Sequence, residues 1–388
     1  MTVTVVLHEA TRTGAPRVGA LIAAGLAQHE DVRVVVLRDG PLVPWLRDVV
    51  GGDRLIVCRT SDFSYQTPFA ERVQHAREML AGDASDLIYV NSVAASPFIL
   101  AAKSLARRVV LHVHEKAAEL LSLLRLDATK LEVVGMADGV VLAADGVAAD
   151  LEEIFGVSFA RRLDFGIVVD VDGIGRLARE RVPAPRNAAG RALPARRRYV
   201  VGMCGTAAAR KGTDIFLETA KAMPELDFVW IGGWSPDEAP DNLSYQDYRA
   251  LALKNLYVTG AVDNPYAYMN RLDLFFLSSR EDPNPLVLAE AAILGIPILA
   301  FSEATAVADW LGRSAILCYG PPNMPDAVRV LQAIAADKAA AGRLRGLAVD
   351  GADRFDLSTK LDGMLAFLAS IRALDTPASI ATPLRDAS

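Results

Sequence analysis

The chain of 388 residues has little cysteine and no long apolar segment, and both absences narrow its class. Its three cysteines (Cys58, Cys204 and Cys318) are far apart, which excludes a disulfide framework and a cysteine-based zinc site. No charge-free apolar run reaches about 18 residues, so we expect no helix that spans a bilayer. The N-terminus lacks the long apolar core of a signal peptide. We therefore expect a cytoplasmic protein.

An excess of positive charge is also missing. Lys and Arg number 41 against 47 Asp and Glu, a net charge of −6, which argues against a general nucleic-acid binder. All five histidines lie in the first 114 residues, and none belongs to a His-Glu-x-x-His arrangement. The dinucleotide-binding pattern Gly-x-Gly-x-x-Gly is absent as well, which counts against a dehydrogenase.

Short, almost continuously apolar runs alternate with amphipathic stretches along most of the chain. Such runs are typical of parallel strands covered on both faces, and their alternation with helical patterns predicts doubly wound α/β sheets. The expected strands are 3–7, 32–37, 55–58, 87–90, 109–113 and 139–143, then 199–204, 228–231, 256–258, 272–277, 296–301 and 315–318.

One segment, 176–198, interrupts the alternation with eight arginines, three prolines and one glutamate. It predicts a linker between an N-terminal domain, 1–175, and a C-terminal domain, 199–360. We assign the amphipathic end of the chain, 361–388, to the first domain. Two Rossmann-like domains, each with a ligand crevice at its strand ends, predict one cleft between them. The linker's charge fits a solvated connector or, alternatively, contact with an anionic membrane surface.

A buried helix is predicted where the chain reads Pro-Asn-Pro-Leu-Val. Asn284 is a good N-cap and Pro285 suits the first helical position of a helix over 285–294. This helix is apolar nearly all round, so we expect it to be buried.

Glu290 is the one charge on that helix, and a buried carboxylate needs a partner. The amides of Leu286 and Val287 form an anion site at the helix start, and Glu290, one turn further on, is placed to accept hydrogen bonds from sugar hydroxyls. The alternative is that Glu290 pairs with a core arginine or caps a neighbouring turn.

A basic loop follows the strand 199–204. Arg210 and Lys211 lie there before a helix that Thr213 is placed to cap, which makes a suitable cradle for a diphosphate. The alternative is an ordinary basic surface turn.

Two further features lie at strand ends in the first half. Gly14 opens the first helix, and its bare backbone allows close approach of a phosphate or sugar. His112 and His114 face the same side of one strand, with His114 at its carboxyl end, facing the cleft. Asn91-Ser92 ends the preceding strand and is expected to line the same cleft. Both histidines are alternatively ordinary core or edge residues.

Taken together, these segments resemble retaining glycosyltransferases of the GT-B fold, family 4, over nearly the whole chain. The specific part is the C-terminal half. There 209–218 resembles the family's basic Lys-Gly segment, and 278–299 resembles its motif of two acidic residues separated by seven others. Seven residues separate Asp282, rather than Glu281, from Glu290, as in the branch that reads Asp-Pro-x-Pro-Leu-Val.

The resemblance implies a role for each candidate residue. The diphosphate would be bound by Arg210, Lys211, Gly14 and the amides of Leu286 and Val287. Glu290 would bind the ribose, and Asp282 would bind the transferred sugar. The reacting carbon of that sugar would lie near His114. Lys211, Asp282, Glu290 and His114 would be the catalytic residues. The resemblance implies no catalytic metal, and we interpret Asp170-Val171-Asp172 as a chance match to a metal motif.

The expected function is the transfer of a sugar from a UDP- or GDP-linked donor, with no other cofactor, to a carbohydrate or lipid-linked acceptor. This activity would serve polysaccharide or glycolipid synthesis, with peripheral contact at the inner membrane face as an open alternative. Two other functions stay open. One is a degenerate protein that binds a nucleotide or glycan without turnover, and the other is a nucleotide-sugar epimerase of the same fold.

Overall fold

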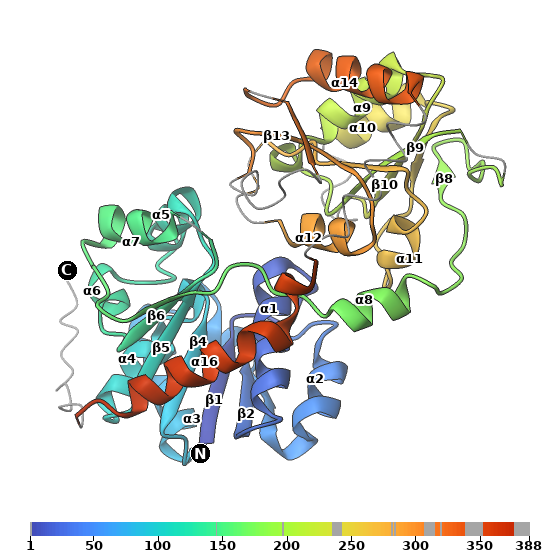
Figure 1. Ribbon diagram of the computed structural model, residues 1–388. Helices are drawn as coiled ribbons and strands as arrows, with labels where there is room; N and C mark the ends of the chain where they lie inside the picture. The colour runs from blue at the N-terminus through green and yellow to red at the C-terminus, as the bar shows by residue number, and fades with distance from the viewer. Residues whose placement is uncertain are drawn as a thin grey trace. The chain divides into compact units, whose positions relative to one another are not determined.

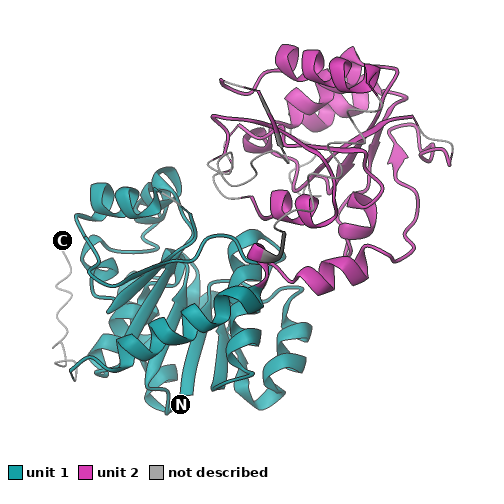
Figure 2. Ribbon diagram, in the orientation of Figure 1, with its two compact units in different colours: residues 1–168, 357–388 teal, residues 169–356 magenta. Residues whose placement is uncertain are grey.

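The computed structural model describes residues 2–144, 146–195, 198–234, 243–280, 282, 285–305, 315–318, 320–337 and 352–375. The described chain divides into two compact units (Figure 2). Unit 1 combines residues within 1–168 and 357–388, and unit 2 comprises residues within 169–356. The chain thus returns to unit 1 at its end.

Unit 1 is built on a seven-stranded sheet in the order β3-β2-β1-β4-β5-β6-β7, with every neighbouring pair parallel (Figure 1). The order reverses between β1 and β4, which is where a doubly wound sheet opens a ligand crevice. Its strands are β1 (Thr2–Leu7), β2 (Asp31–Val36), β3 (Leu55–Val57), β4 (Leu87–Asn91), β5 (Arg108–Val113), β6 (Gly139–Leu142) and β7 (Arg162–Asp164). Its helices are α1 (Gly14–Leu26), α2 (Val43–Val50), α3 (Phe69–Ala81), α4 (Pro97–Ser104), α5 (Ala117–Arg125), α6 (Leu131–Val134), α7 (Val147–Phe155) and α16 (Leu357–Arg372).

Unit 2 repeats the plan with the order β14-β13-β12-β9-β10-β11-β8, and its reversal lies between β9 and β12. Its strands are β8 (Arg186–Asn187), β9 (Val200–Cys204), β10 (Asp227–Ile231), β11 (Leu256–Val258), β12 (Leu274–Phe276), β13 (Ile298–Phe301) and β14 (Ala315–Cys318). Its helices are α8 (Val171–Leu177), α9 (Thr213–Ala222), α10 (Leu243–Leu251), α11 (Tyr266–Met269), α12 (Leu286–Ile293) and α14 (Met324–Ala336). Only β8 runs antiparallel to its neighbour among the described strands.

All twelve expected strands are present, with ends within two residues of the expected ones. Apolar runs predict them because both faces of each sheet are covered. The sequence analysis missed β7 and β8, which are short, lie at sheet edges and carry exposed arginines. Strands of this kind show no apolar run.

The expected linker, 176–198, needs correction. Unit 2 begins at Val169, so α8 and the whole segment 176–198 belong to it. Within the segment, β8 pairs with β11 through Asn187, which is buried, and Tyr257. The segment is held through backbone pairing, which leaves no apolar pattern in the sequence. Its composition alone therefore suggested a free connector.

Helix α16 packs on unit 1 beside α1 and β5 (Figure 1). Met364, Leu368 and Ile371 form its fully buried stripe. At its end the Arg372 guanidinium binds the Glu30 carboxylate with nitrogen–oxygen distances of 2.7 and 2.6 Å. Because both side chains are nearly buried, this two-point ion pair fixes the end of the helix.

Among the described residues, no helix combines the length and the apolar character that crossing a bilayer requires.

Removing the core contact of α16 should destabilise unit 1. We expect Leu368→Ala to lower the free energy of unfolding by about 3 kcal/mol, because Leu368 is fully buried and its truncation leaves a cavity. Asp362→Ala, on the exposed face of the same helix, should change it by less than about 0.5 kcal/mol. Urea unfolding followed by circular dichroism measures both. Equal effects of the two variants would show that α16 does not stabilise the unit.

Candidate functional site

Two loops meet at the reversal point of the unit 2 sheet. The loop 205–212 follows β9, and the loop that contains 278–282 follows β12, the strand next to β9. Since parallel strands end at the same edge, their loops lie side by side, at the place where α/β sheets bind ligands.

A charged cluster connects these loops. The Lys211 ammonium forms an ion pair with the Asp282 carboxylate, and the Arg210 guanidinium lies 3.8 Å from the same carboxylate. Ser279 donates a further hydrogen bond to Asp282 at 3.3 Å. The Lys211 and Asp282 side chains are only 18% and 10% exposed, so their charges interact more strongly than a surface pair would. The structure therefore brings together three of the residues that the sequence analysis singled out.

Arg280 braces the basic loop through side-chain and backbone hydrogen bonds, a role that the sequence analysis missed. Its guanidinium binds Asp214 at 2.7 and 2.6 Å and the Ala209 carbonyl at 2.8 Å. Its backbone amide donates to the Arg210 carbonyl at 2.8 Å. The bond from Arg280 lowers the pKa of Asp214, which keeps the pair charged. In the sequence, the only sign of this role is that Arg280 is the single basic residue in the loop 278–282.

Gly212 allows the two loops to approach this closely. Its φ is +64°, and a Cβ atom at this position would collide with the Ser278 carbonyl oxygen. The Ser278 hydroxyl in turn donates to the Lys211 carbonyl at 2.9 Å. Thr213 does not cap α9 as expected. Gly212 occupies the N-cap position, and the Thr213 hydroxyl binds the Ala208 carbonyl at 3.0 Å instead.

The start of α12 also differs from expectation. Pro285, rather than Asn284, is the N-cap residue, and Asn284 lies outside the described residues. The ring of proline leaves no side-chain group to cap a helix. Leu286 and Val287 are the first two helical residues, so their amides point out of the helix start, as the anion-site interpretation requires.

Glu290 is buried one turn into α12 with 1% of its surface exposed. The Tyr266 hydroxyl on α11 donates to its Oε1 at 3.0 Å. This partner was not recognised in the sequence. A hydrogen-bond donor offsets part of the cost of burying the carboxylate.

A second polar cluster lies at the reversal point of the unit 1 sheet. His112, on β5, and His114, just after its end, do face the same side, and their rings are in contact with centroids 3.9 Å apart and an interplanar angle of 37°. His114 Nε2 lies 2.9 Å from Asn91 Oδ1, while the His112 ring bonds the Tyr89 hydroxyl at 2.8 Å. Gly14 is exposed at the start of α1.

Burial keeps both histidines neutral. Removal from water lowers the pKa of His114 to about 3, with His8 contributing through its charge. The pKa of His112 lies well below its ordinary value for the same reason, with His114 as the second cause. Ser92, next to Asn91, has a φ of +87°, a strained conformation for a residue with a side chain. Such strain is concentrated at functional sites.

The structure thus assembles the candidate residues in two sets. Arg210, Lys211, Asp282 and the start of α12 belong to unit 2, and Gly14 and His114 belong to unit 1.

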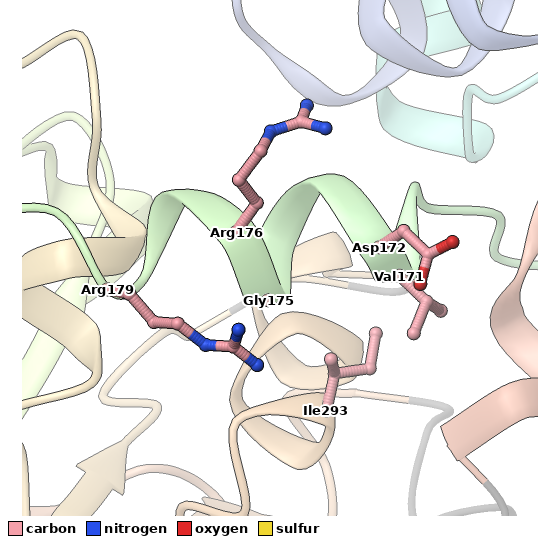
Figure 3. Close-up of a pocket in the computed structure, with 6 residues that line it drawn as sticks. All are labelled: Val171, Asp172, Gly175, Arg176, Arg179 and Ile293. Atoms are coloured by element: carbon pink, nitrogen blue, oxygen red, sulfur yellow. The ribbon is translucent and has the colours of Figure 1, made fainter.

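The pocket in Figure 3 is separate from these sets. It has a volume of about 430 Å³ and lies between α8 and Ile293 at the far end of α12, so it contains none of the candidate residues. Arg179 extends toward Ile293, and Arg176 leaves the opposite side of α8. Nearby, Asp170 is the N-cap of α8, where it accepts a hydrogen bond from the Gly173 amide at 2.8 Å. Asp170, the first acidic residue of Asp170-Val171-Asp172, thus has a structural role as a helix cap.

Comparisons with known proteins identify a family profile and a fold. Residues 198–335 match the sequence profile of the family described as "Glycosyl transferases group 1". Over the residues that the structure describes, the chain has the GT-B fold. HepE from Anabaena, solved in complex with UDP-glucose, superimposes with a TM-score of 0.74 at 18% identity over 95% of this chain and 100% of that chain. WaaG, a glycosyltransferase involved in lipopolysaccharide biosynthesis, gives 0.68 at 15% identity over 94% and 99%.

A curated relative matches a shorter stretch. The alpha-galactosylglucosyldiacylglycerol synthase of Streptococcus pneumoniae is 31% identical over 106 residues, which is 26% of this chain and 28% of the relative. The match therefore spans less than a third of either protein.

The close approach at Gly212 predicts a specific sensitivity to added side chains. Gly212→Ala should lower the free energy of unfolding by about 3 kcal/mol, because the left-handed backbone and the collision with Ser278 both add cost. Gly190→Ala is the matched control, with a φ of +77° and no atom within 4 Å of the added carbon. It should cost only about 1 kcal/mol, the backbone part alone. Urea unfolding measures the difference, and equal costs would mean that the loops are not in contact.

The neutral histidines predict that acid destabilises unit 1. Below pH 6.5 the unfolded chain takes up protons that folded His112 and His114 do not, so stability is full above pH 6.5 and falls with decreasing pH. We expect a loss of about 3 kcal/mol between pH 7.5 and 5.5 from the two together. His112→Asn should remove about half of this loss, whereas the exposed His29→Gln should retain all of it. Urea unfolding at both pH values tests this, and identical slopes in all three proteins would contradict it.

Proposed function

We propose that this protein is a glycosyltransferase that moves a sugar from a nucleoside diphosphate sugar to a carbohydrate or lipid-linked acceptor. One observation carries the proposal. The stretch that matches the glycosyl transferases group 1 profile contains the Lys211–Asp282 cluster and Glu290, and the cluster lies at the reversal point of its sheet. A ligand-binding position and a chemically suitable set of side chains therefore coincide.

The cluster suits a leaving diphosphate. Negative charge grows on the diphosphate as the glycosidic bond breaks, and fixed cations lower the energy of that transition state. An ammonium group has three N–H donors, so Lys211 can keep its bond to Asp282 and still bind phosphate oxygens. The Arg280 brace holds Arg210 and Lys211 in place before the donor arrives.

The first turn of α12 extends the same site. The amides of Leu286 and Val287 add partial positive charge where the helix begins. Glu290 Oε1 is held by Tyr266, and we assign the carboxylate as the acceptor for the ribose hydroxyls of the donor. Phosphate and ribose are adjacent groups of one nucleotide, and the helix start and Glu290 are likewise adjacent, one turn apart.

The finer assignments follow from the same residues. The spacing of Asp282 and Glu290 favours the retaining, family 4 type, with Asp282 at the transferred sugar and His114 near its reacting carbon. The supply of positive charge by side chains and amides favours a reaction without a catalytic metal. HepE was solved with UDP-glucose and the pneumococcal relative is named for a glycolipid, so we place UDP before GDP as the donor base and include lipid-linked acceptors.

Turnover measurements on charge variants test the proposal. Release of nucleoside diphosphate from UDP-glucose, UDP-galactose and GDP-mannose should identify a donor, with and without added diacylglycerol glycolipid or oligosaccharide acceptors. Lys211→Ala and Glu290→Gln should each lower turnover by about 10²–10³-fold, the usual scale for one preorganised charge contact. Lys221→Ala, which removes an exposed lysine from α9, should retain wild-type turnover.

Two outcomes would contradict the proposal. Near-wild-type turnover in both site variants would remove the assigned site. Thermal stabilisation of the wild type by UDP or GDP, with neither transfer nor donor hydrolysis, would identify a binding protein instead.

A further inference from the structure

Asn91 occupies a central place in the unit 1 cluster, and nothing in the proposed reaction yet uses it. It is the last residue of β4, is fully buried, and pairs in register with Leu7 of β1 and His112 of β5. Its side chain fills a notch in α1, because a Cβ atom on Gly19 would lie 2.7 Å from Asn91 Cγ. The amide therefore has one well-defined position.

Its two hydrogen bonds have only one consistent assignment. Asn91 Nδ2 donates to the Ala15 carbonyl oxygen at 3.0 Å, and a carbonyl oxygen only accepts, so this bond fixes the orientation of the amide. Asn91 Oδ1 consequently faces His114 Nε2 at 2.9 Å. An amide oxygen also only accepts, so the proton of the neutral imidazole is on Nε2 and the lone pair is on Nδ1.

The neighbours of His114 support the same state. The ring of His112 lies against it at 3.9 Å and is itself held by the Tyr89 hydroxyl, so the imidazole is supported on its face as well as its edge. Burial and the nearby His8 keep the ring neutral. A neutral ring with one fixed N–H presents a hydrogen-bond acceptor at the other nitrogen.

We propose that Asn91 is a positioning residue that holds His114 as the Nε2–H tautomer and ties its ring to the first turn of α1. The inference rests on the proposed function, in which His114 lies at the donor sugar. It deepens that function by assigning the chemistry of the contact. Nδ1 would accept a hydrogen bond from a sugar hydroxyl, and the ring would not act as a charged group. The bond to Ala15 makes Gly14, its neighbour in sequence, move together with the ring.

The tautomer can be observed directly by nitrogen-15 NMR. Long-range proton–nitrogen spectra of ¹⁵N-histidine-labelled protein report which ring nitrogen carries the proton, and the chain has only five histidines. A His114→Gln variant assigns the signal. At pH 7 we expect wild-type His114 to be a single Nε2–H tautomer.

Variants of Asn91 separate positioning from folding. Asn91→Leu removes the acceptor at similar size, so His114 should populate both tautomers and turnover should fall by about 10–100-fold. Asn91→Asp retains an acceptor, so the Nε2–H tautomer should persist, and the added negative charge should raise the pKa of His114. Ser96→Ala removes another buried hydrogen bond of unit 1, to the Ala128 carbonyl, and should leave the His114 signals unchanged.

The outcomes distinguish this inference from the proposed function. An Nδ1–H or averaged His114 signal in the wild type, or an unchanged tautomer in Asn91→Leu, would overturn the positioning role even if sugar transfer is observed. If Asn91→Leu fails to fold, the His114 tautomer and the raised pKa of His114 in Asn91→Asp test the positioning role instead. The expected NMR pattern in a protein without sugar transfer would support the positioning role and contradict the proposed function.

Discussion

The ion pair between Lys211 and Asp282 is the interaction on which the unit 2 site depends. It joins the loop after β9 to the loop after β12, and its members are mostly removed from water. A pair of this kind is costly unless each charge has further partners. Arg210 and Ser279 supply them to Asp282, and Gly212 lets the two loops approach. The site is therefore formed by packing as much as by charge.

The two units share a plan but differ in the electrostatics of their reversal points. In unit 2 the strand ends carry the Lys211–Asp282 ion pair. In unit 1 the network of Asn91, His112 and His114 lies at an edge that also carries the Glu9–Arg38 ion pair and the buried Glu115. Charged groups suit a diphosphate, and oriented neutral groups suit the hydroxyls of a sugar. The same fold therefore offers different chemistry at equivalent places, because function depends on the side chains at the strand ends.

An element could be predicted from the sequence only where its burial or its chemistry leaves a recognisable residue pattern. The twelve longer strands were predictable, since burial on both faces leaves continuous apolar runs. The edge strands β7 and β8 were not, because pairing through the backbone leaves no such pattern. Within the site, the spacing of Lys211, Asp282 and Glu290 was visible in the sequence. The Arg280 brace and the bond from Tyr266 were not, since each joins segments at least 24 residues apart.

Asn91 shows why the last level of detail requires coordinates. Asn91 and His114 were both visible in the sequence as strand-end residues, but a tautomer depends on which atom faces which. That direction is decided by the Ala15 carbonyl, a backbone group present in any sequence. Because the amide is buried, an inverted orientation would place two acceptors together at Ala15, at a cost of about 1–3 kcal/mol. Burial thus converts an ambiguous side chain into one that specifies the protonation state of its neighbour.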